Sequence, residues 1–204
     1  MTRRGVTLAI MIAAAVARTP VAFAQVGSVS ATAPLAASFS TLWSAPSASG
    51  RANIAATLTV LVNAGGAQNI PSLVDNRINT FPIPVNITTS WNLATLITAV
   101  DLVAYFTIPT AALVNGPNSI PSSRMLGRVV TGVPRTFTAF AQNPIGGVGT
   151  PGGSLHLFRQ FILAPINAVG QRTDNLDLQL DLRGIPNLPA GTYAGTLNIR
   201  AIAY

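Results

Sequence analysis

The amino-acid sequence predicts an all-β fold, an antiparallel β-sandwich of eight or nine strands. Short stretches with alternating apolar and polar residues recur along the chain, and this spacing is typical of strands with one buried face. The 17 glycines and 15 prolines punctuate these stretches with turns, and no long helical pattern separates them. One-sided alternation fits two sheets packed apolar face to apolar face, whereas the strands of a parallel α/β sheet are continuously apolar.

Length and composition indicate a single folded domain preceded by a tail. The chain has 204 residues, 49% of them hydrophobic and 8% charged, and its mean hydropathy is +0.48. This composition excludes general disorder, and the length suffices for a sizeable core. One histidine and no cysteine leave almost no ligands for a zinc site or an iron–sulfur cluster, and no thiol nucleophile.

Residues 1–24 have the pattern of a cleaved export signal. Arg3 and Arg4 precede an apolar stretch over residues 6–17, and Ala22-Phe23-Ala24 supplies a cleavage site before Gln25. The apolar stretch is too short to span a bilayer. We therefore expect an exported protein, in the periplasm, at the cell surface or extracellular, with no integral membrane segment after cleavage. The arginine pair also resembles a twin-arginine signal, so both that route and the general secretory route stay open.

The charge pattern predicts no nucleic-acid partner. Removing 24 of the 204 residues leaves 180, and the loss of three of the twelve arginines lowers the net charge from +7 to +4. Every basic residue is arginine and every acidic residue is aspartate. The remaining arginines are scattered singly from Arg51 to Arg200, without the stripe or cluster of a nucleic-acid-binding surface.

Residues 25–50 form an uncharged, Ser/Ala-rich N-terminal segment, a possible donor or edge strand, and residues 51–204 form the β-sandwich domain. The strands expected in the domain are, in chain order, 53–62, 85–91, 100–107, 124–130, 135–141, 154–163, 175–182 and 192–204. The first alternates clearly and ends at the turn sequence Asn63-Ala64-Gly65-Gly66. Residues 93–100 also fit helical spacing, so a short helix is the alternative between the second and third strands.

The second half of the domain contains the clearest strand and the clearest loop. Residues 109–118 predict a loop with one helical turn, and residues 131–134 join the fourth strand to the fifth. Residues 143–153 are rich in glycine and proline and are the most loop-like part of the chain. Residues 154–163 are apolar on both faces, whereas 175–182 place four leucines on one face, and 192–204 close the chain.

His156 is the only histidine and therefore the only candidate for a catalytic base of a serine hydrolase. The sequence has no G-x-S-x-G elbow. On the alternating pattern His156 lies opposite Leu155 and Leu157, which indicates a solvent-facing strand position rather than a base next to a nucleophile.

The aspartates offer two possible chemistries, glycoside hydrolysis and calcium binding. Asp177 and Asp181 share one strand face at roughly 13 Å, which exceeds the separation that either glycosidase geometry requires. Asp174, Asn175 and Asp177 offer oxygen ligands for calcium but lack the glycine and the bidentate glutamate of an EF-hand loop. A solvated strand face is the favoured interpretation.

Two further motifs are candidates for ligand binding. The run Gly146-Gly147-Val148-Gly149 lacks the Lys-Ser/Thr ending of a phosphate-binding loop, so we interpret it as a flexible loop. Trp43, Trp91, Tyr105 and Tyr193 share no face by their spacing, so core or scattered positions are favoured over a sugar-stacking platform. The sequence thus predicts no catalytic, cofactor-binding or metal-binding residue and no cofactor.

The stretch from Leu188 to Leu197, with Gly191-Thr192-Tyr193 followed by Thr196 and a final Tyr204, resembles the closing strand of spore-coat-U-type secreted domains and archaic chaperone–usher pilins. This chain departs from those families in having no cysteine. The resemblance implies an incomplete immunoglobulin-like sandwich whose missing strand comes from a neighbouring subunit. Residues 25–35 would then be the donor, because strand donation satisfies an otherwise unpaired edge.

Two functions follow as expectations. The first is a non-enzymatic, exported structural or cell-surface subunit, pilin-like, that acts through its edges and surface. Its partners would be copies of itself or related subunits, joined by strand addition. The alternative is an extracellular carbohydrate- or ligand-binding module that uses exposed aromatics and the loop at 143–153. The sequence leaves open whether residues 25–35 pair in cis or in trans.

Overall fold

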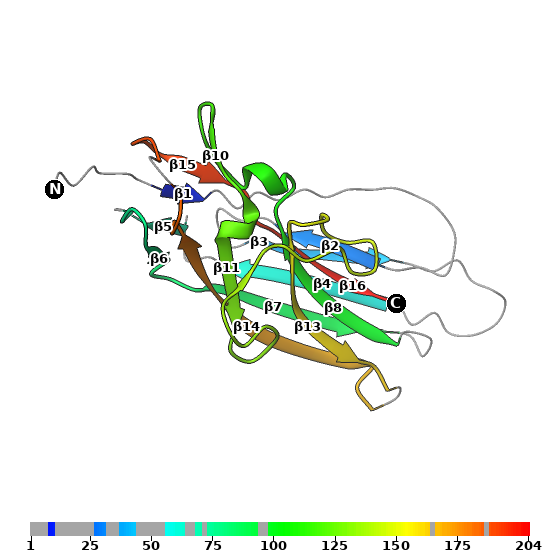
Figure 1. The fold of residues 1–204 in the computed structure, drawn as a ribbon. Helices are drawn as coiled ribbons and strands as arrows, with labels where there is room; N and C mark the ends of the chain where they lie inside the picture. Colours follow the sequence, from blue (N-terminus) through cyan, green and yellow to red (C-terminus); the bar gives the residue numbers. More distant parts are fainter. Residues whose placement is uncertain are drawn as a thin grey trace.

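Strands account for 55% of the chain and helix for almost none of it, in sheets that are antiparallel except for one strand pair, so the predicted all-β class is confirmed. The computed structural model describes residues 8–10, 27–31, 37–43, 56–63, 68–70, 73–93, 98–163, 166–185 and 188–204. Figure 1 shows these strands as layers of long, twisted arrows. Two short 3₁₀ turns, Pro109–Ala111 and Ser122–Arg124, are the helical elements of the described part.

The largest sheet has seven strands. Its order is β12-β11-β14-β7-β4-β3, and β6 also pairs with β14. The strands are β12 (Thr138–Ala139), β11 (Met125–Val129), β14 (Val169–Asp181), β7 (Val85–Asn92), β4 (Ala56–Asn63), β3 (Ala37–Trp43) and β6 (Ile78–Thr80). Strand β7 alternates buried and half-buried side chains along its whole length, as expected for one core-facing side.

A second sheet has four strands in the order β13-β8-β16-β2. They are β13 (Ser154–Phe161), β8 (Ala99–Tyr105), β16 (Asn198–Ala203) and β2 (Gly27–Ala31). A third sheet of five short strands has the order β10-β9-β15-β1-β5. Its strands are β10 (Asn118–Ile120), β9 (Leu113–Asn115), β15 (Tyr193–Gly195), β1 (Leu8–Ile10) and β5 (Gln68–Ile70).

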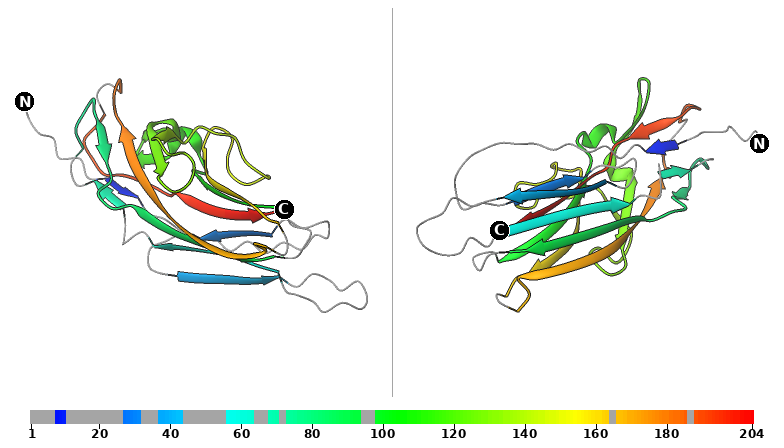
Figure 2. Two further views of the ribbon diagram at one scale, coloured as in Figure 1. Left: turned by 90° about the horizontal axis from the view of Figure 1, so that it is seen from below. Right: turned by 180° about the vertical axis from the view of Figure 1, so that it is seen from behind.

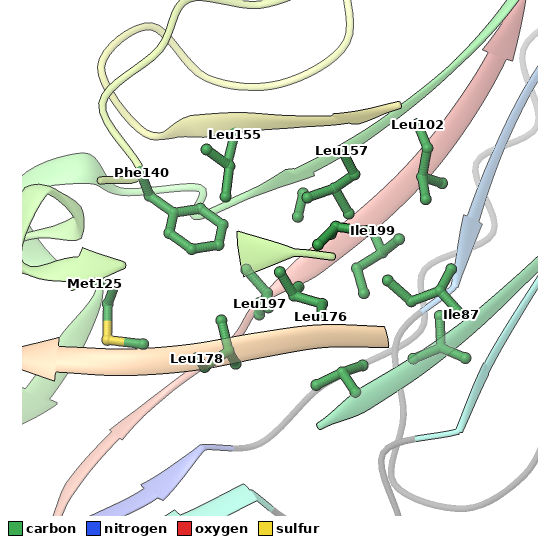
Figure 3. Close-up of a cluster of buried hydrophobic side chains, with 14 of the residues drawn as sticks. Ile87, Leu102, Met125, Phe140, Leu155, Leu157, Leu176, Leu178, Leu197 and Ile199 are labelled. Atoms are coloured by element: carbon green, nitrogen blue, oxygen red, sulfur yellow. The ribbon is translucent and has the colours of Figure 1, made fainter. Parts of the chain in front are cut away.

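One hydrophobic core joins the seven-stranded and four-stranded sheets (Figure 3). Its buried side chains include Ile87, Met125, Leu176 and Leu178 from the first sheet and Leu102, Leu155, Leu157 and Ile199 from the second. Phe140, which follows β12, packs edge-on against Phe106 with ring centroids 5.3 Å apart. The alternating leucines of the sequence therefore do form the interior between the layers.

Several predicted boundaries were wrong. Strand β14 begins at Val169 rather than at 175, because its first residues also pair with β7. The predicted strand 135–141 is reduced to Thr138–Ala139, because Phe140 turns into the core. The predicted loop 109–118 contains β9 and the start of β10, which form a hairpin around Gly116 at φ +56°.

The closing strand is divided rather than continuous. Tyr193–Gly195 belongs to the five-stranded sheet and Asn198–Ala203 to the four-stranded sheet. A Cβ on Gly195 would lie 1.9 Å from the carbonyl oxygen of Ala112, so the chain passes that backbone closely before it changes sheets. Of the alternative helix over 93–100, residues 94–97 lie outside the described residues, and Ala99 and Val100 belong to β8.

The predicted N-terminal regions are described only in part. Leu8–Ile10, which falls inside the predicted export signal, forms β1 and pairs parallel with β15. The rest of residues 1–24 lies outside the described residues, so the signal stays a prediction. Within residues 25–50, the structure describes the backbone of β2 and β3.

Candidate functional site

The outer face of the four-stranded sheet is covered by the glycine-rich loop. Val103 of β8 and Ile202 of β16 point away from the main core, yet both are buried against Val148 of the loop. Gly146 allows this approach: it has φ +56°, and a Cβ there would lie 2.3 Å from Ile202 Cδ1. The segment predicted as a flexible loop is thus packed onto the sheet.

Beside this cover, three polar side chains meet at a buried carboxylate. Asp101 of β8 has no exposed side-chain surface. Its Oδ1 accepts hydrogen bonds from His156 Nε2 at 2.9 Å and from Arg159 Nε at 2.8 Å. Its Oδ2 accepts hydrogen bonds from Arg159 NH2 at 2.9 Å and from the hydroxyl of Tyr204 at 2.5 Å. We call Asp101, His156, Arg159 and Tyr204 the Asp101 cluster.

The strand register explains why these residues meet. Arg159 lies directly opposite Asp101 in the β13–β8 pairing, and a register shift between His156 and Phe158 brings His156 within reach as well. Tyr204 follows β16, the other neighbour of β8. Its backbone carbonyl accepts hydrogen bonds from the amides of Thr98 and Ala99. The cluster therefore ties β8, β13 and Tyr204 together.

The charges in the cluster stabilise the ionised carboxylate. Burial would raise the pKa of Asp101, but hydrogen bonds from His156, Arg159 and Tyr204 outweigh it and hold that pKa well below its usual range. Burial and the hydrogen bond to Asp101 raise the pKa of the Tyr204 hydroxyl, and the same carboxylate raises the pKa of Arg159. Asp101 is thus a permanent anion at neutral pH, with all its acceptor positions occupied.

The side chains of the Asp101 cluster are bonded to one another in a structural arrangement. His156 lies on the outer face of β13, as predicted, but its side chain is only 20% exposed and it contacts Asp101 rather than open solvent. Among the described residues, the hydrogen bonds of the His156 ring go to Asp101 alone. A base must reach a nucleophile, and within the described ranges the imidazole is hydrogen-bonded to a carboxylate and not to a hydroxyl. Sequence reasoning missed Asp101, although a lone acid within an apolar strand was a signal that a buried partner exists.

The remaining aspartates do not converge. Asp174 is buried and binds Arg172 (2.7 Å) and Thr131 (2.8 Å), whereas Asp177 faces the opposite side of β14 and pairs with Arg128 at 2.6 Å. Asp174 therefore lies on the opposite face of the sheet from Asn175 and Asp177, the other two candidate calcium ligands. Asp181 pairs with Arg183, and that hydrogen bond lowers the pKa of Asp181. In the described part of the chain, no group of three His, Asp, Glu or Cys residues could hold a metal ion.

The aromatic residues considered for sugar stacking do not share an exposed face. Trp91 is 7% exposed and Tyr193 is fully buried, both in the main core. Tyr105 packs partly buried against the outer cluster around Val103. The side chain of Trp43 lies outside the described residues.

The second edge of the closing strand is covered by N-terminal segments. Strand β16 has β8 on one side and β2 on the other, in antiparallel register with Ile199 opposite Ala31 and Ala203 opposite Gly27. Strand β15 has β9 on one side and β1 on the other. In the part of the chain that the structure describes, β2 pairs with β16 alone. Both views in Figure 2 show β2 alongside the closing strand.

Comparison of this chain with family models, with curated proteins and with solved structures finds no match. Within the described residues, no helix has the length and apolar character needed to cross a membrane.

Proposed function

We propose that this protein is an exported, non-enzymatic structural or cell-surface subunit, pilin-like, with an immunoglobulin-like β-sandwich. It acts through strand edges, and its partners are copies of itself or related subunits. The observation that carries the proposal is the pairing of the closing strand: one side of β16 is held by β8 and the other by β2, which follows the predicted signal.

An edge filled by a separable segment suits exchange between copies. Strand β2 contributes backbone hydrogen bonds to one neighbour, so another copy's β2 could make the same bonds in the same register. The pairing within one chain supplies that register, and it matches the donor segment 25–35 that the family resemblance implies. Strand addition also protects an edge that would otherwise aggregate.

The composition of the closing strand's surroundings also supports contact rather than chemistry. The polar groups of the Asp101 cluster, at the end of β16, are engaged with one another. A subunit that binds its neighbour through the edge of β16 benefits from this arrangement, because the hydrogen bond from Tyr204 to Asp101 holds the end of that strand in place.

Engineered cysteines test the exchange, since the natural chain has none. Val29 and Ala201 are opposite each other in the β2–β16 register, and opposed residues of antiparallel strands have the Cα separation that a disulfide needs. Copies carrying Val29→Cys are mixed with copies carrying Ala201→Cys and then oxidised. We expect a covalent heterodimer on a non-reducing gel.

The register supplies a matched control. Ser30 is opposite Arg200, so Ser30→Cys mixed with Ala201→Cys should give much less heterodimer because side chains alternate between faces. Each single variant is also oxidised alone, because a disulfide between two identical copies must be distinguished from the heterodimer. A mixture that stays monomeric, while the double variant Val29→Cys/Ala201→Cys forms an internal disulfide, would refute strand exchange.

A further inference from the structure

One strand of the five-stranded sheet comes from the predicted export signal. Strand β1 lies between β15 and β5 in this sheet, as Figure 1 shows. Its Ala9 is opposite Ala194 of β15 in parallel register and opposite Asn69 of β5 in antiparallel register. Removal of residues 1–24 would therefore take out a strand that pairs on both sides.

The place that β1 would leave has the width of one strand. Neighbouring strands are about 4.8 Å apart, so β15 and β5 would face each other across about 10 Å. Both facing edges would carry backbone N–H and C=O groups without their present partners. An open edge of this kind is a template for pairing with another chain. We call this place the β15–β5 slot.

The strands on either side of the slot are part of the folded body. Tyr193 of β15 is fully buried and Ile70 of β5 is 5% exposed, and both belong to the main core. Strand β15 also pairs with β9 on its other side. Gly195 packs closely as well, because a Cβ there would lie 1.9 Å from the carbonyl oxygen of Ala112. Strand β15 is thus held in position by contacts that do not involve β1.

The residues along the slot indicate what kind of segment fits. Its edges are Gln68–Ile70 and Tyr193–Gly195, and none of these residues is charged. The segment now in place, Leu8–Ile10, is uncharged and contains no proline. A charge beside the core would lack a partner, and a proline between two strands would remove a ladder hydrogen bond. The slot therefore suits a short, neutral, extended segment.

We propose that removal of the predicted signal turns the β15–β5 slot into a binding site for a neutral, extended peptide segment of another chain, which adds parallel to β15 in the place of β1. Before removal, β1 blocks the site, because a tethered strand competes at an effective concentration on the order of millimolar. The inference shares signal cleavage with the proposed function, but the site is separate from the edge of β16, where β2 pairs.

A cysteine in the slot traps the incoming segment in register. The protein carries Ala194→Cys, and the probe is a synthetic peptide of residues 5–13 with Ala9→Cys. Opposed residues of neighbouring strands have the Cα separation that a disulfide needs. Oxidation should join the peptide to the exported, cleaved chain, which a mass shift records. The uncleaved chain should need about a hundredfold more peptide for the same yield, because its own β1 competes.

The register supplies a control peptide. With the cysteine at Leu8 instead of Ala9, the thiol would lie opposite Tyr193 and not opposite Ala194. Side chains of successive residues point to opposite faces, so the disulfide yield should fall by about tenfold or more. Equal yields from the two peptides would overturn the parallel register.

Two full-length variants separate blocking of the slot from folding. In the uncleaved chain, Ala9→Cys/Ala194→Cys should form an internal disulfide, which reports that β1 occupies the slot. Ala9→Pro in the uncleaved Ala194→Cys chain should open the slot without cleavage, because the proline removes a ladder hydrogen bond. That variant should take up the peptide about as readily as the cleaved chain does.

Three results would overturn the inference. They are a cleaved chain that takes up no peptide, equal uptake by the cleaved and uncleaved chains, and an exported chain whose mass still includes residues 1–24. None of them bears on exchange at the edge of β16, which Val29→Cys and Ala201→Cys report separately. Failure of that exchange would in turn leave the slot and its peptide standing.

Discussion

The outer faces of the two larger sheets differ in how they treat charge. On the seven-stranded sheet, Arg128 and Asp177 pair at 2.6 Å, but their side chains are 37% and 28% exposed. On the four-stranded sheet, the loop lies over Val103, and Asp101 beside it is fully buried. The two arginines are similarly exposed, at 37% for Arg128 and 39% for Arg159, so the faces differ in the aspartate. Water reaches Asp177 and screens its ion pair, whereas Asp101 is shielded from water and its interactions are screened less.

Replacing each of the two aspartates by asparagine should give the largest difference in stability between the two faces. Asp101→Asn leaves Arg159 and His156 facing a neutral amide in a buried site, so we expect the free energy of unfolding to fall by about 3 kcal/mol or more. Asp177→Asn should lower it by less than about 1 kcal/mol. Urea denaturation of both variants measures the difference, and equal losses would show that burial of Asp101 has no energetic weight.

Glycine substitutions test whether the loop cover is a packed layer. Gly146 and Gly116 both have φ +56°, but a Cβ at Gly146 would meet Ile202 while a Cβ at Gly116 would meet nothing within 4 Å. Gly116→Ala should cost about 1 kcal/mol through backbone strain. Gly146→Ala should cost about 1–3 kcal/mol more through overpacking. Thermal unfolding of the pair gives the difference, and similar melting temperatures would argue against tight packing of the loop.

As the pH falls, the loop-covered face of the four-stranded sheet should lose stability at a higher pH than the outer face of the seven-stranded sheet. Asp101 has a folded-state pKa below its unfolded value near 3.9, so its stabilisation is complete above about pH 4 and is lost as the pH falls through the folded pKa. Tyr204 has the opposite sign: its raised pKa gives stability below about pH 10 that is lost at higher pH. Denaturation from pH 2 to 7 should show a shallower loss for Asp101→Asn than for the natural chain. Parallel curves would exclude Asp101 as the main acid-sensitive group.

Two neighbouring threonines give the smallest expected effect. Thr89 faces the core of the seven-stranded sheet, is 1% exposed, and its hydroxyl has no hydrogen-bond partner among the described residues. Thr89→Val should raise the free energy of unfolding by about 1 kcal/mol, because it removes an unsatisfied buried hydroxyl. Thr88→Val, on the outer face, should lower it by about 0.5 kcal/mol through loss of the bond to Thr173. A destabilised Thr89→Val would indicate that this hydroxyl is satisfied.

The same contrast explains what the sequence could predict. Strands β7 and β14 have one face in the core and one in water, so their alternation was visible and their existence was predicted correctly. Strand β8 is buried on both faces, so its sequence is apolar almost throughout and says little about what covers it. The cover comes from residues 143–153, whose composition indicates a loop but not where the loop packs.

The Asp101 cluster could not be assembled from local patterns. Asp101 and Arg159 are 58 positions apart, and Tyr204 is a further 45 beyond Arg159. Their meeting depends on the β13–β8 register and on the irregularity next to His156, neither of which alternation specifies. The division of the closing strand has a similar origin, because the close approach of Gly195 to Ala112 is a tertiary contact.

The position of β16 inside its sheet also constrains how the protein is made. Strand β8 is synthesised about half-way along the chain, but one of its two partners consists of residues 198–203. The central layer stays incomplete until residues 198–203 have been made, since long-range strand pairing must wait for both partners. Between the synthesis of β8 and that of β16, one edge of β8 therefore waits for its final partner.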